Sequence, residues 1–451
     1  MSSEPLTITA AAPLVRSGEL TPSDLLEQCL RRIDIYEPAV KAWAYLDRER
    51  ARQDAAKATD EIKAGHYRGP LHGIPVGIKD IIDVFDMPTG CGSKLWANSY
   101  ARRDATCVER LRQAGAVILG KTVTTAYASL DPPVTRNPWN LERTPGGSSS
   151  GSAAAVACGM CLAALGTQTG GSTIRPASYC GVYSLKPTWG RVSVDGVLPL
   201  APSLDHIGVM ANCVRDLAIM FEAIAGPAAT GLFHPGRTGP AQDCVGRIDR
   251  PPAERPVIVP LGGMFGEAQS VVADAFRRLC AELDETETSG IAIPPAGFAE
   301  LLKAHRVIMS VEAATYHAER LQRHPDDYGR NMRLLIEDGL AAPATAYRFA
   351  RVFRDDLEEQ ITKQLLGRVF VTPATAELPP PPDTTGDPRF NAPWSFTGHP
   401  TICLPVEWID GLPFAAQFTG LPSCEDDLLS LGAAVENDIA LPRRLPPVPA
   451  V

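Results

Sequence analysis

The 451-residue sequence predicts an α/β fold, and two observations support this prediction. Segments whose apolar residues follow a helical period alternate with short, uninterrupted apolar runs, which are typical of buried strands. The composition is that of a soluble globular protein, with 45% hydrophobic and 21% charged residues. The length alone would allow about three domains of about 150 residues, but large α/β enzymes often form one unit.

The N-terminal part begins with two predicted helices. Thr21 is suited to be an N-cap, and Pro22 is suited to the first helical position. A 3.6-residue period then follows in Leu25, Leu26, Cys29, Leu30 and Ile33. The second helix is predicted over Asp47–Ala64 and ends at Gly65.

The next elements alternate between strand and helix. The run Gly73–Asp80 is interpreted as a buried strand that places Lys79 at its end. Asp104 is predicted to cap a helix that runs through Ala114, with Gly115 as its stop. Three further elements follow, namely a strand at Ala116–Leu119, a Gly/Ser loop at Pro145–Gly151 and a helical segment at Ser152–Cys158.

The second half gives weaker patterns. We expect a loop over Gly226–Pro256, followed by charged helices, and loops where proline is abundant. The predicted strands are Val257–Pro260, Arg368–Thr372 and Thr401–Val406, and the proline-rich segments are Glu377–Pro388 and the tail Leu441–Val451.

Charge and cysteine content exclude several classes of protein. The formal net charge is -9 and no Lys/Arg run offers a local exception, which argues against a nucleic-acid partner. The 11 cysteines have no regular spacing and fit a reducing compartment. Cys158 and Cys161 form a C-x-x-C among small apolar residues, and we interpret them as buried and structural. With neither a signal peptide nor about 18 consecutive apolar residues, we expect a cytoplasmic protein without a membrane partner.

Two further motifs match by pattern but not by context. Gly115–Thr122 satisfies the phosphate-loop pattern, yet Ala, Val, Ile and Leu occupy its centre and are interpreted as a strand. Gly147–Gly151 satisfies G-x-S-x-G, but the proline-rich segment before it cannot be the strand of a nucleophile elbow. His206 and His399 would be the loose candidates for its base. The eight histidines show no metal-binding spacing, so no metal or cofactor is expected.

Three features remain that carry chemistry. Lys79 ends an apolar strand, Gly146–Gly151 is a flexible Gly/Ser loop, and glycines directly precede Ser172. Each feature alone also has a purely structural interpretation, such as a lysine with ordinary hydrogen-bond partners or a flexible loop without a catalytic role. The glycines permit a tight turn whose successive backbone N–H groups point one way, which is the geometry of an oxyanion hole.

Together these features resemble the amidase signature family over most of the chain, more weakly in about 226–365. The matching segments are Arg143–Ala157, Gly77–Asp80, Gly120–Thr122, Asn137–Asn140, Cys180–Gly181, Leu185–Thr188, Gly190–Ser193, Ser203–Asp205, Gly208, Val371–Pro373 and Thr397–Pro400. The resemblance implies a single domain with a mixed central sheet surrounded by helices. In it we expect a signature core at about 65–225, a variable substrate-side region at about 226–365 and a C-terminal return at about 366–440.

The resemblance also assigns roles. It implies that Lys79 is the general base, Ser148 the bridging serine and Ser172 the nucleophile. The oxyanion donors fall on the backbone of Thr169, Gly170, Gly171 and Ser172. A free lysine has a pKa near about 10.4, so Lys79 can be a base only if its surroundings lower that value. Ser149 is the second choice for the bridge and more naturally supports the loop through hydrogen bonds.

The segment around Ser172 departs from the common family pattern. Gln168 stands where the family has Asp, and Arg175 follows Ser172 by three residues instead of two. This variant resembles the malonamidase subgroup, in which the corresponding arginine binds a substrate carboxylate. Arg175 is thus a candidate for anion binding, with a structural role as the alternative. The segment Ala128–Pro138 is short for the family and suggests an open pocket rim.

We therefore expect a hydrolase of small amides or carbamates (urethanes) that needs no cofactor and is compatible with a homodimer. One alternative is the glutamine-hydrolysing A-type component of a tRNA amidotransferase, which would need partner proteins. Gln168, Arg175 and the lack of a basic face weigh against it. The other alternative is an inactive binding or scaffold protein on the same fold, against which the intact Lys79, Ser148 and Ser172 argue.

Overall fold

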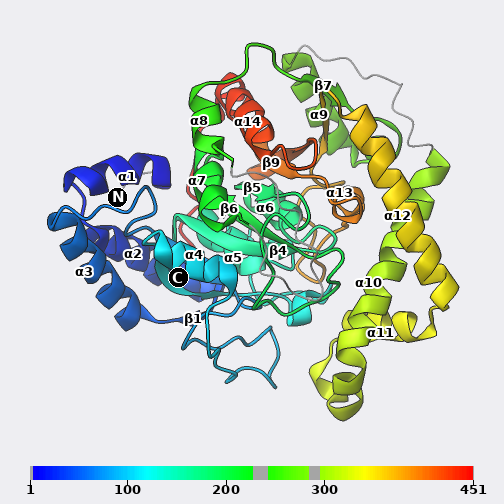
Figure 1. The fold of residues 1–451 in the computed structure, drawn as a ribbon, viewed down its shortest axis with the longest axis horizontal. Helices are drawn as coiled ribbons and strands as arrows, with labels where there is room; N and C mark the ends of the chain where they lie inside the picture. The colour runs from blue at the N-terminus through cyan, green and yellow to red at the C-terminus, as the bar shows by residue number, and fades with distance from the viewer. Residues whose placement is uncertain (1–3, 227–241, 284–294, 450–451) are drawn as a thin grey trace.

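The computed structural model describes residues 4–226, 242–283 and 295–449. The strands in these ranges form one mixed sheet of 10 strands in the order β1-β3-β2-β4-β6-β5-β9-β10-β8-β7. The parallel strands β3, β2 and β4 lie toward one end, and antiparallel pairs join β4 to β8 through β6, β5, β9 and β10. Helices surround this sheet, so the predicted α/β fold is confirmed (Figure 1).

The strands are β1 (Trp43–Leu46), β2 (Pro75–Lys79), β3 (Val117–Thr122), β4 (Ala163–Gln168), β5 (Tyr183–Lys186), β6 (His206–Ala211), β7 (Val257–Pro260), β8 (Arg368–Pro373), β9 (Thr401–Ile409) and β10 (Leu412–Thr419). The predicted strands correspond to β2, β3, β7, β8 and β9. Because β2 and β4 are parallel neighbours, their carboxyl ends place Lys79 and the residues after Gln168 at the same edge of the sheet.

The helices are α1 (Ile8–Ser17), α2 (Pro22–Val40), α3 (Arg48–Lys63), α4 (Thr106–Gln113), α5 (Ser150–Ala157), α6 (Ile174–Cys180), α7 (Val214–Ile224), α8 (Cys244–Asp249), α9 (Ser270–Glu282), α10 (Pro295–Arg323), α11 (Arg330–Ala341), α12 (Ala344–Gln364), α13 (Ala392–Phe396) and α14 (Glu425–Ile439). Short 3₁₀ helices lie at Ala126–Ala128, Gly263–Gly266 and Pro325–Asp327. Helices α1 to α3 lie at one side of the sheet and α10 to α12 at the other (Figure 1). Among the described helices, none combines the length and apolar composition needed to cross a bilayer.

One of the two predicted caps is confirmed. The Thr21 side chain accepts a hydrogen bond from the Asp24 N–H at the start of α2. Asp47, predicted as the first residue of its helix, instead caps α3 through the Arg50 N–H. Asp104 is a correction: α4 begins at Thr106, and the Asp104 carboxylate instead accepts from the Phe85 N–H at 2.7 Å. It also binds Arg112 Nε at 2.9 Å, so tertiary partners occupy the predicted cap.

The interpretation of Gly226–Pro256 as a loop is wrong in part. Residues 227–241 lie outside the described ranges, but α8 lies within the remainder. The Asp243 side chain caps this helix, which packs against α7 and α14. Cys244 is the one buried residue of α8, so no amphipathic period reveals the helix in the sequence.

The two proline-rich segments behave as predicted. Residues 377–388 contain neither helix nor strand, and the tail from residue 441 has none through residue 449. The tail lies against α2, where the Tyr36 hydroxyl donates to the Pro446 carbonyl at 2.8 Å.

A second apolar cluster lies apart from the main core and holds α10 and α13 near the carboxyl edge of the sheet. Its members include Leu301 and Ile308 of α10 and Trp394 and Phe396 of α13. Both helices carry side chains that reach the loop after β4, namely His305 and Ser395.

Candidate active site

Lys79 lies at the end of β2 with no exposed surface. Its Nζ is 2.7 Å from Ser148 Oγ and 2.7 Å from Thr167 Oγ1. Burial lowers the pKa of Lys79 well below its ordinary value of 10.5, although the Asp205 carboxylate acts in the opposite direction. A neutral amine can accept a proton, which a lysine in water at neutral pH cannot do.

The Gly/Ser loop brings Ser148 to this amine. The Gly147–Ser148 peptide bond is cis, and the Thr125 N–H donates to the Ser148 carbonyl at 3.2 Å. Ser149 is fully buried and its hydroxyl exchanges two 3.1 Å hydrogen bonds with the backbone of Thr167. These are loop-supporting contacts, as expected for Ser149, whereas the lysine contact falls on Ser148.

The loop after β4 presents backbone N–H groups and turns its carbonyls away. In the described part of the chain, the N–H groups of Gly170, Gly171 and Ser172 meet no acceptor. Side chains from other elements bind two carbonyls of the loop. Thr169 O accepts from His305 Nε2 at 3.0 Å, and Gly170 O accepts from Ser395 Oγ at 2.9 Å. Such an arrangement leaves preorganised donors for a developing negative charge.

The position of Ser172 fits this loop. Its carbonyl accepts from the Ser149 N–H at 3.2 Å, which places the two loops side by side. Its side chain is 8% exposed, and its hydroxyl has no hydrogen-bond partner among the described residues. A side chain at Gly171 would lie 2.6 Å from Asn391 Oδ1 and 2.8 Å from Arg175 Nη1, so glycine is required there.

The structure explains why glutamine stands at position 168. Gln168 Oε1 accepts from the Thr173 and Ile174 N–H groups at 2.9 and 3.0 Å, at the start of α6. Its amide nitrogen donates to Ser395 Oγ at 3.0 Å, and that hydroxyl in turn donates to Gly170 O. An aspartate is a shorter acceptor without an N–H group, so it cannot make the contact to Ser395.

Asp205 contacts the same loop from the other side. Its carboxylate accepts from Thr169 Oγ1 at 2.5 Å and from the N–H groups of Leu200 and Ala201 at 2.9 and 3.1 Å. Burial raises the pKa of this carboxyl to about 6. The sequence places Asp205 in a matching segment but gives it no role at the site.

Arg175 is 1% exposed and contacts backbone. Nε donates to Thr385 O at 2.6 Å and Nη2 to Gly147 O at 2.7 Å, while Nη1 has no partner among the described residues. Arg175 therefore joins the proline-rich loop to the carbonyl of the peptide that precedes Ser148. These contacts favour the structural role for Arg175 that the sequence left open as the alternative. A substrate carboxylate would have to reach a buried nitrogen of the Arg175 guanidinium.

The rejected motifs have structural roles in this protein. Lys121 is buried in β3 and pairs with Asp80 at 3.0 Å, so it does not face a phosphate loop. The residues directly before Gly147 form no strand, and His206 Nδ1 is 2.6 Å from Leu204 O. Within the described ranges no group of three His, Cys, Asp or Glu residues has metal-binding geometry.

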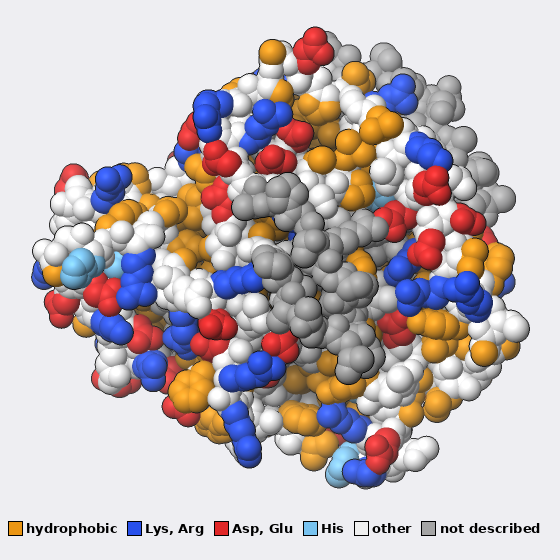
Figure 2. All heavy atoms as spheres, viewed as in Figure 1, with side chains coloured by type: hydrophobic (Ala, Val, Ile, Leu, Met, Phe, Trp, Pro, Cys, Tyr) orange, Lys and Arg blue, Asp and Glu red, His pale blue; other side chains and the backbone are white. Residues whose placement is uncertain are grey.

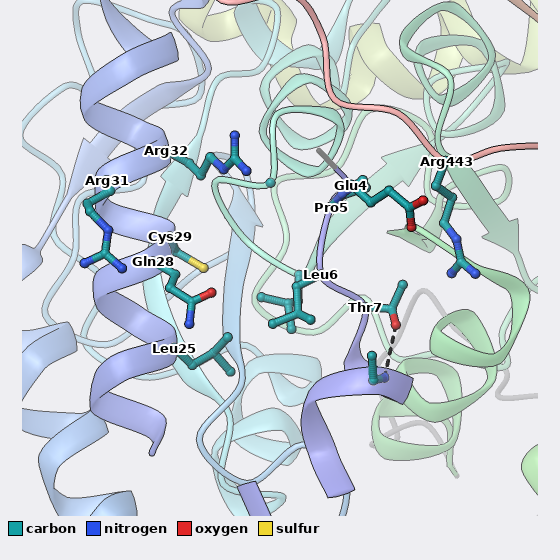
Figure 3. Close-up of a pocket in the computed structure, with 13 residues that line it drawn as sticks. Glu4, Pro5, Leu6, Thr7, Leu25, Gln28, Cys29, Arg31, Arg32 and Arg443 are labelled. Atoms are coloured by element: carbon teal, nitrogen blue, oxygen red, sulfur yellow. Dashed lines mark hydrogen bonds between the residues drawn. The ribbon is translucent and has the colours of Figure 1, made fainter. Parts of the chain in front are cut away.

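A separate cavity of about 390 Å³ lies between the N-terminal segment, α2 and Arg443 (Figure 3). None of the candidate active-site residues described above lines it. Its one thiol, Cys29, is a poor nucleophile because burial raises its pKa to about 12. Chemistry therefore favours the edge beside Lys79 as the active site.

Comparison with known proteins agrees with this geometry. The family model described as Amidase matches residues 24–429. The chain belongs to the amidase family. It is therefore an amidase-type hydrolase that acts on C–N bonds.

The curated relatives of this amidase include enzymes with different names. It is 33% identical to a putative amidase, AmiD, of Mycobacterium tuberculosis, over 98% of this chain and 96% of the relative. It is 34% identical to the A-type component of the glutamyl-tRNA(Gln) amidotransferase of Roseiflexus castenholzii, over 98% of each. Among solved structures, the peptide amidase of Stenotrophomonas maltophilia has a TM-score of 0.84 at 28% identity, covering 98% of this chain and 99% of that one.

The sequence indicated the loops of the site but not several side chains that support them. Thr167, which lies in β4 and contacts Lys79 Nζ, was not indicated by the sequence. His305 and Ser395 had no signal in the sequence either, because 136 and 225 residues separate them from the carbonyls that they bind.

Proposed function

We propose that this amidase hydrolyses small amides or carbamates (urethanes) through an acyl-enzyme on Ser172. The observation that carries the proposal is the 2.7 Å contact between the buried Lys79 amine and Ser148, beside a loop of unpartnered N–H groups. A base, a relay hydroxyl and an oxyanion site are the parts that acyl transfer requires.

In the proposed mechanism, Lys79 accepts the proton of Ser148 while Ser148 accepts that of Ser172. The Ser172 oxygen attacks the substrate carbonyl, and the N–H groups of Gly170, Gly171 and Ser172 bind the oxyanion, with Thr169 as the fourth predicted donor. The relay returns a proton to the leaving nitrogen as the C–N bond breaks. Water then attacks the ester and restores the serine, so no cofactor takes part.

Removing the Ser172 hydroxyl tests this mechanism. Ser172→Ala should lower kcat on a p-nitroanilide and on an aryl carbamate by at least about 10³-fold, because the acyl-enzyme cannot form. Ser17→Ala, at an exposed serine, is the matched control. Circular dichroism should show both variants folded, and unchanged turnover by Ser172→Ala would refute the nucleophile assignment.

The amidotransferase alternative makes a different prediction. A glutaminase component needs partner proteins, whereas the proposed hydrolase turns over small amides as a purified single chain. Activity confined to glutamine, and only in the presence of added proteins, would favour the alternative. Loss of all hydrolysis by the wild-type chain on every amide would favour an inactive scaffold.

The substrate screen contains neutral amides, dicarboxylic half-amides, aryl carbamates and a C-terminally amidated dipeptide. Arg175 contacts Gly147 O, which supports a role in positioning Ser148 instead of binding a substrate acid. Arg175→Met should then lower kcat on neutral and acidic amides alike, by about tenfold or more. A selective rise in KM for half-amides alone would support carboxylate binding.

A further inference from the structure

The outer face of α12 carries apolar side chains that its own chain leaves uncovered. Phe349 is 55% exposed and Val352 40% exposed, while Ala350, Leu357 and Ile361 on the opposite face are buried. Residues 345, 348, 349, 352, 356 and 359 follow one another at spacings of three or four, or as neighbours, so they share this outer face. The face belongs to a helix of 21 residues.

Charges on this outer face are divided by position. Arg348 lies toward the N-terminal half, whereas Asp355, Asp356 and Glu359 lie beyond Val352, and Lys363 in the last turn pairs with Glu359. Arg348 and Asp356 are exposed and neither has an ion-pair partner among the described residues. Figure 2 shows hydrophobic, basic and acidic side chains exposed along the right side of the molecule, where Figure 1 places α12.

This pattern is complementary to itself when reversed. Arg348 and Asp356 lie four residues before and four residues after Val352, or about 6 Å on either side along the axis. If two copies of α12 pack antiparallel with their Val352 side chains in contact, each Arg348 faces the Asp356 of the other copy. The two Phe349 rings then flank the Val352 contact. Because the contact is symmetric, both Arg348–Asp356 pairs form at the same time.

We propose that the protein forms a homodimer through α12, with the two helices antiparallel about a two-fold axis near Val352. Leu340, in α11, is 63% exposed, and Leu366, which follows α12, is 67% exposed, so exposed leucines lie near both ends of the helix.

A second copy fits this surface better than an unrelated protein. An unrelated partner protein would need a surface complementary to this face of α12. Binding such a partner would not require the face to be complementary to a second, antiparallel copy of itself. An isologous contact does demand it, because residue 348 meets residue 356 twice. The inference does not depend on the proposed reaction, since α12 carries none of the residues assigned to it.

Sedimentation equilibrium of the full chain tests the dimer. The wild type should have a mass of twice 48.2 kDa at micromolar concentration. Val352→Arg, Arg348→Asp and Asp356→Arg should each raise the dimer dissociation constant by at least about tenfold, because each places like charges together or buries a charge at the contact. Val448→Arg, at a 65% exposed residue of the tail, is the matched control and should leave the mass unchanged.

Mixing the two charge variants gives the sharpest result. Arg348→Asp presents two acidic groups, and Asp356→Arg presents two basic groups, so each repels its own copy. An equimolar mixture should form a heterodimer in which both cross-contacts are attractive. The double variant R348D/D356R should also regain the homodimer. A monomeric wild type, or a dimer that all three single substitutions leave intact, would overturn the proposal.

Discussion

Lys79 exchanges the water shell of an ordinary lysine for two hydroxyl oxygens, those of Ser148 and Thr167. The nearest opposing influence is the Asp205 carboxyl, itself buried and with its pKa raised to about 6. Desolvation dominates, so the folded protein keeps the amine neutral where water would protonate it. The same burial that makes Lys79 a base therefore makes its protonated form costly for the fold.

We predict an acid limb in the pH–rate profile that belongs to Lys79. As pH falls through its lowered pKa, the amine takes up a proton and can no longer accept from Ser148, so kcat/KM falls. Above that pKa the profile should be flat. Rates on an uncharged carbamate, whose own ionisation does not interfere, provide the measurement. A profile without an acid limb would contradict a general-base role for Lys79.

The free energy of unfolding should also depend on pH through Lys79. Between the lowered pKa and 10.5, the unfolded chain binds a proton at Lys79 that the folded chain does not. The free energy of unfolding contributed by this site therefore rises with pH across that window. Lys79→Met should be more stable than the wild type in urea at low pH, and this advantage should shrink as pH approaches 10.5.

At the level of elements, helix α1 shows what a sequence cannot reveal. Asp216 in α7 accepts from the Ile8 N–H and the Thr9 N–H, both at 2.8 Å, and from Thr9 Oγ1 at 2.6 Å. Thr7 caps α1 locally through the Ala10 N–H, and Asp216 adds acceptors for two further N–H groups from more than 200 residues away in sequence. Thr21 and Asp47, which cap α2 and α3 from the adjacent residue, were predictable from the sequence alone.

Removing the distant cap should loosen the N-terminal helix. Asp216→Ala leaves two N–H groups without their acceptor at the N-terminus of α1, and should lower the free energy of unfolding by about 2–3 kcal/mol. Asp249→Ala, which breaks the exposed pair with Arg215, is the control and should change it by less than about 1 kcal/mol. Equal losses in the two variants would contradict the capping role of Asp216.

The same distinction applies to the candidate site. Lys79 and the two loops were predictable because glycine, serine and the strand pattern are local signals and match a family. The sequence showed only that Gln168 departs from the family pattern. Its contacts, which join the start of α6 to Ser395, depend on how the chain folds. Side chains that bind carbonyls across the sheet leave no local pattern, so His305 and Ser395 could not be predicted.

For the whole molecule, the cysteines report how completely the chain is folded. All 11 lie within the described ranges and none forms a disulfide; Cys424 is half-buried while the others are buried. Burial raises the pKa of the thiols of Cys158 and Cys161 well above the ordinary value. The C-x-x-C pair is thus buried in the folded protein, as interpreted from the sequence.

Thiol titration should separate the folded and unfolded states. With 5,5′-dithiobis(2-nitrobenzoic acid) at pH 8, the native protein should react rapidly at no more than one cysteine, Cys424, because a protonated and buried thiol is a poor nucleophile. In guanidinium chloride all 11 should react. Rapid reaction of several thiols in the native state would contradict this packing.

The contacts of the loop after β4 also have a consequence for truncated chains. Lys79, Ser148 and Ser172 all lie in the first half of the sequence, whereas Ser395, which donates to the Gly170 carbonyl, lies 225 residues beyond that glycine. On the proposed mechanism, a chain that stops before Ser395 carries the three proposed catalytic side chains but lacks a side chain that orients the oxyanion loop. We therefore expect such a chain to be inactive.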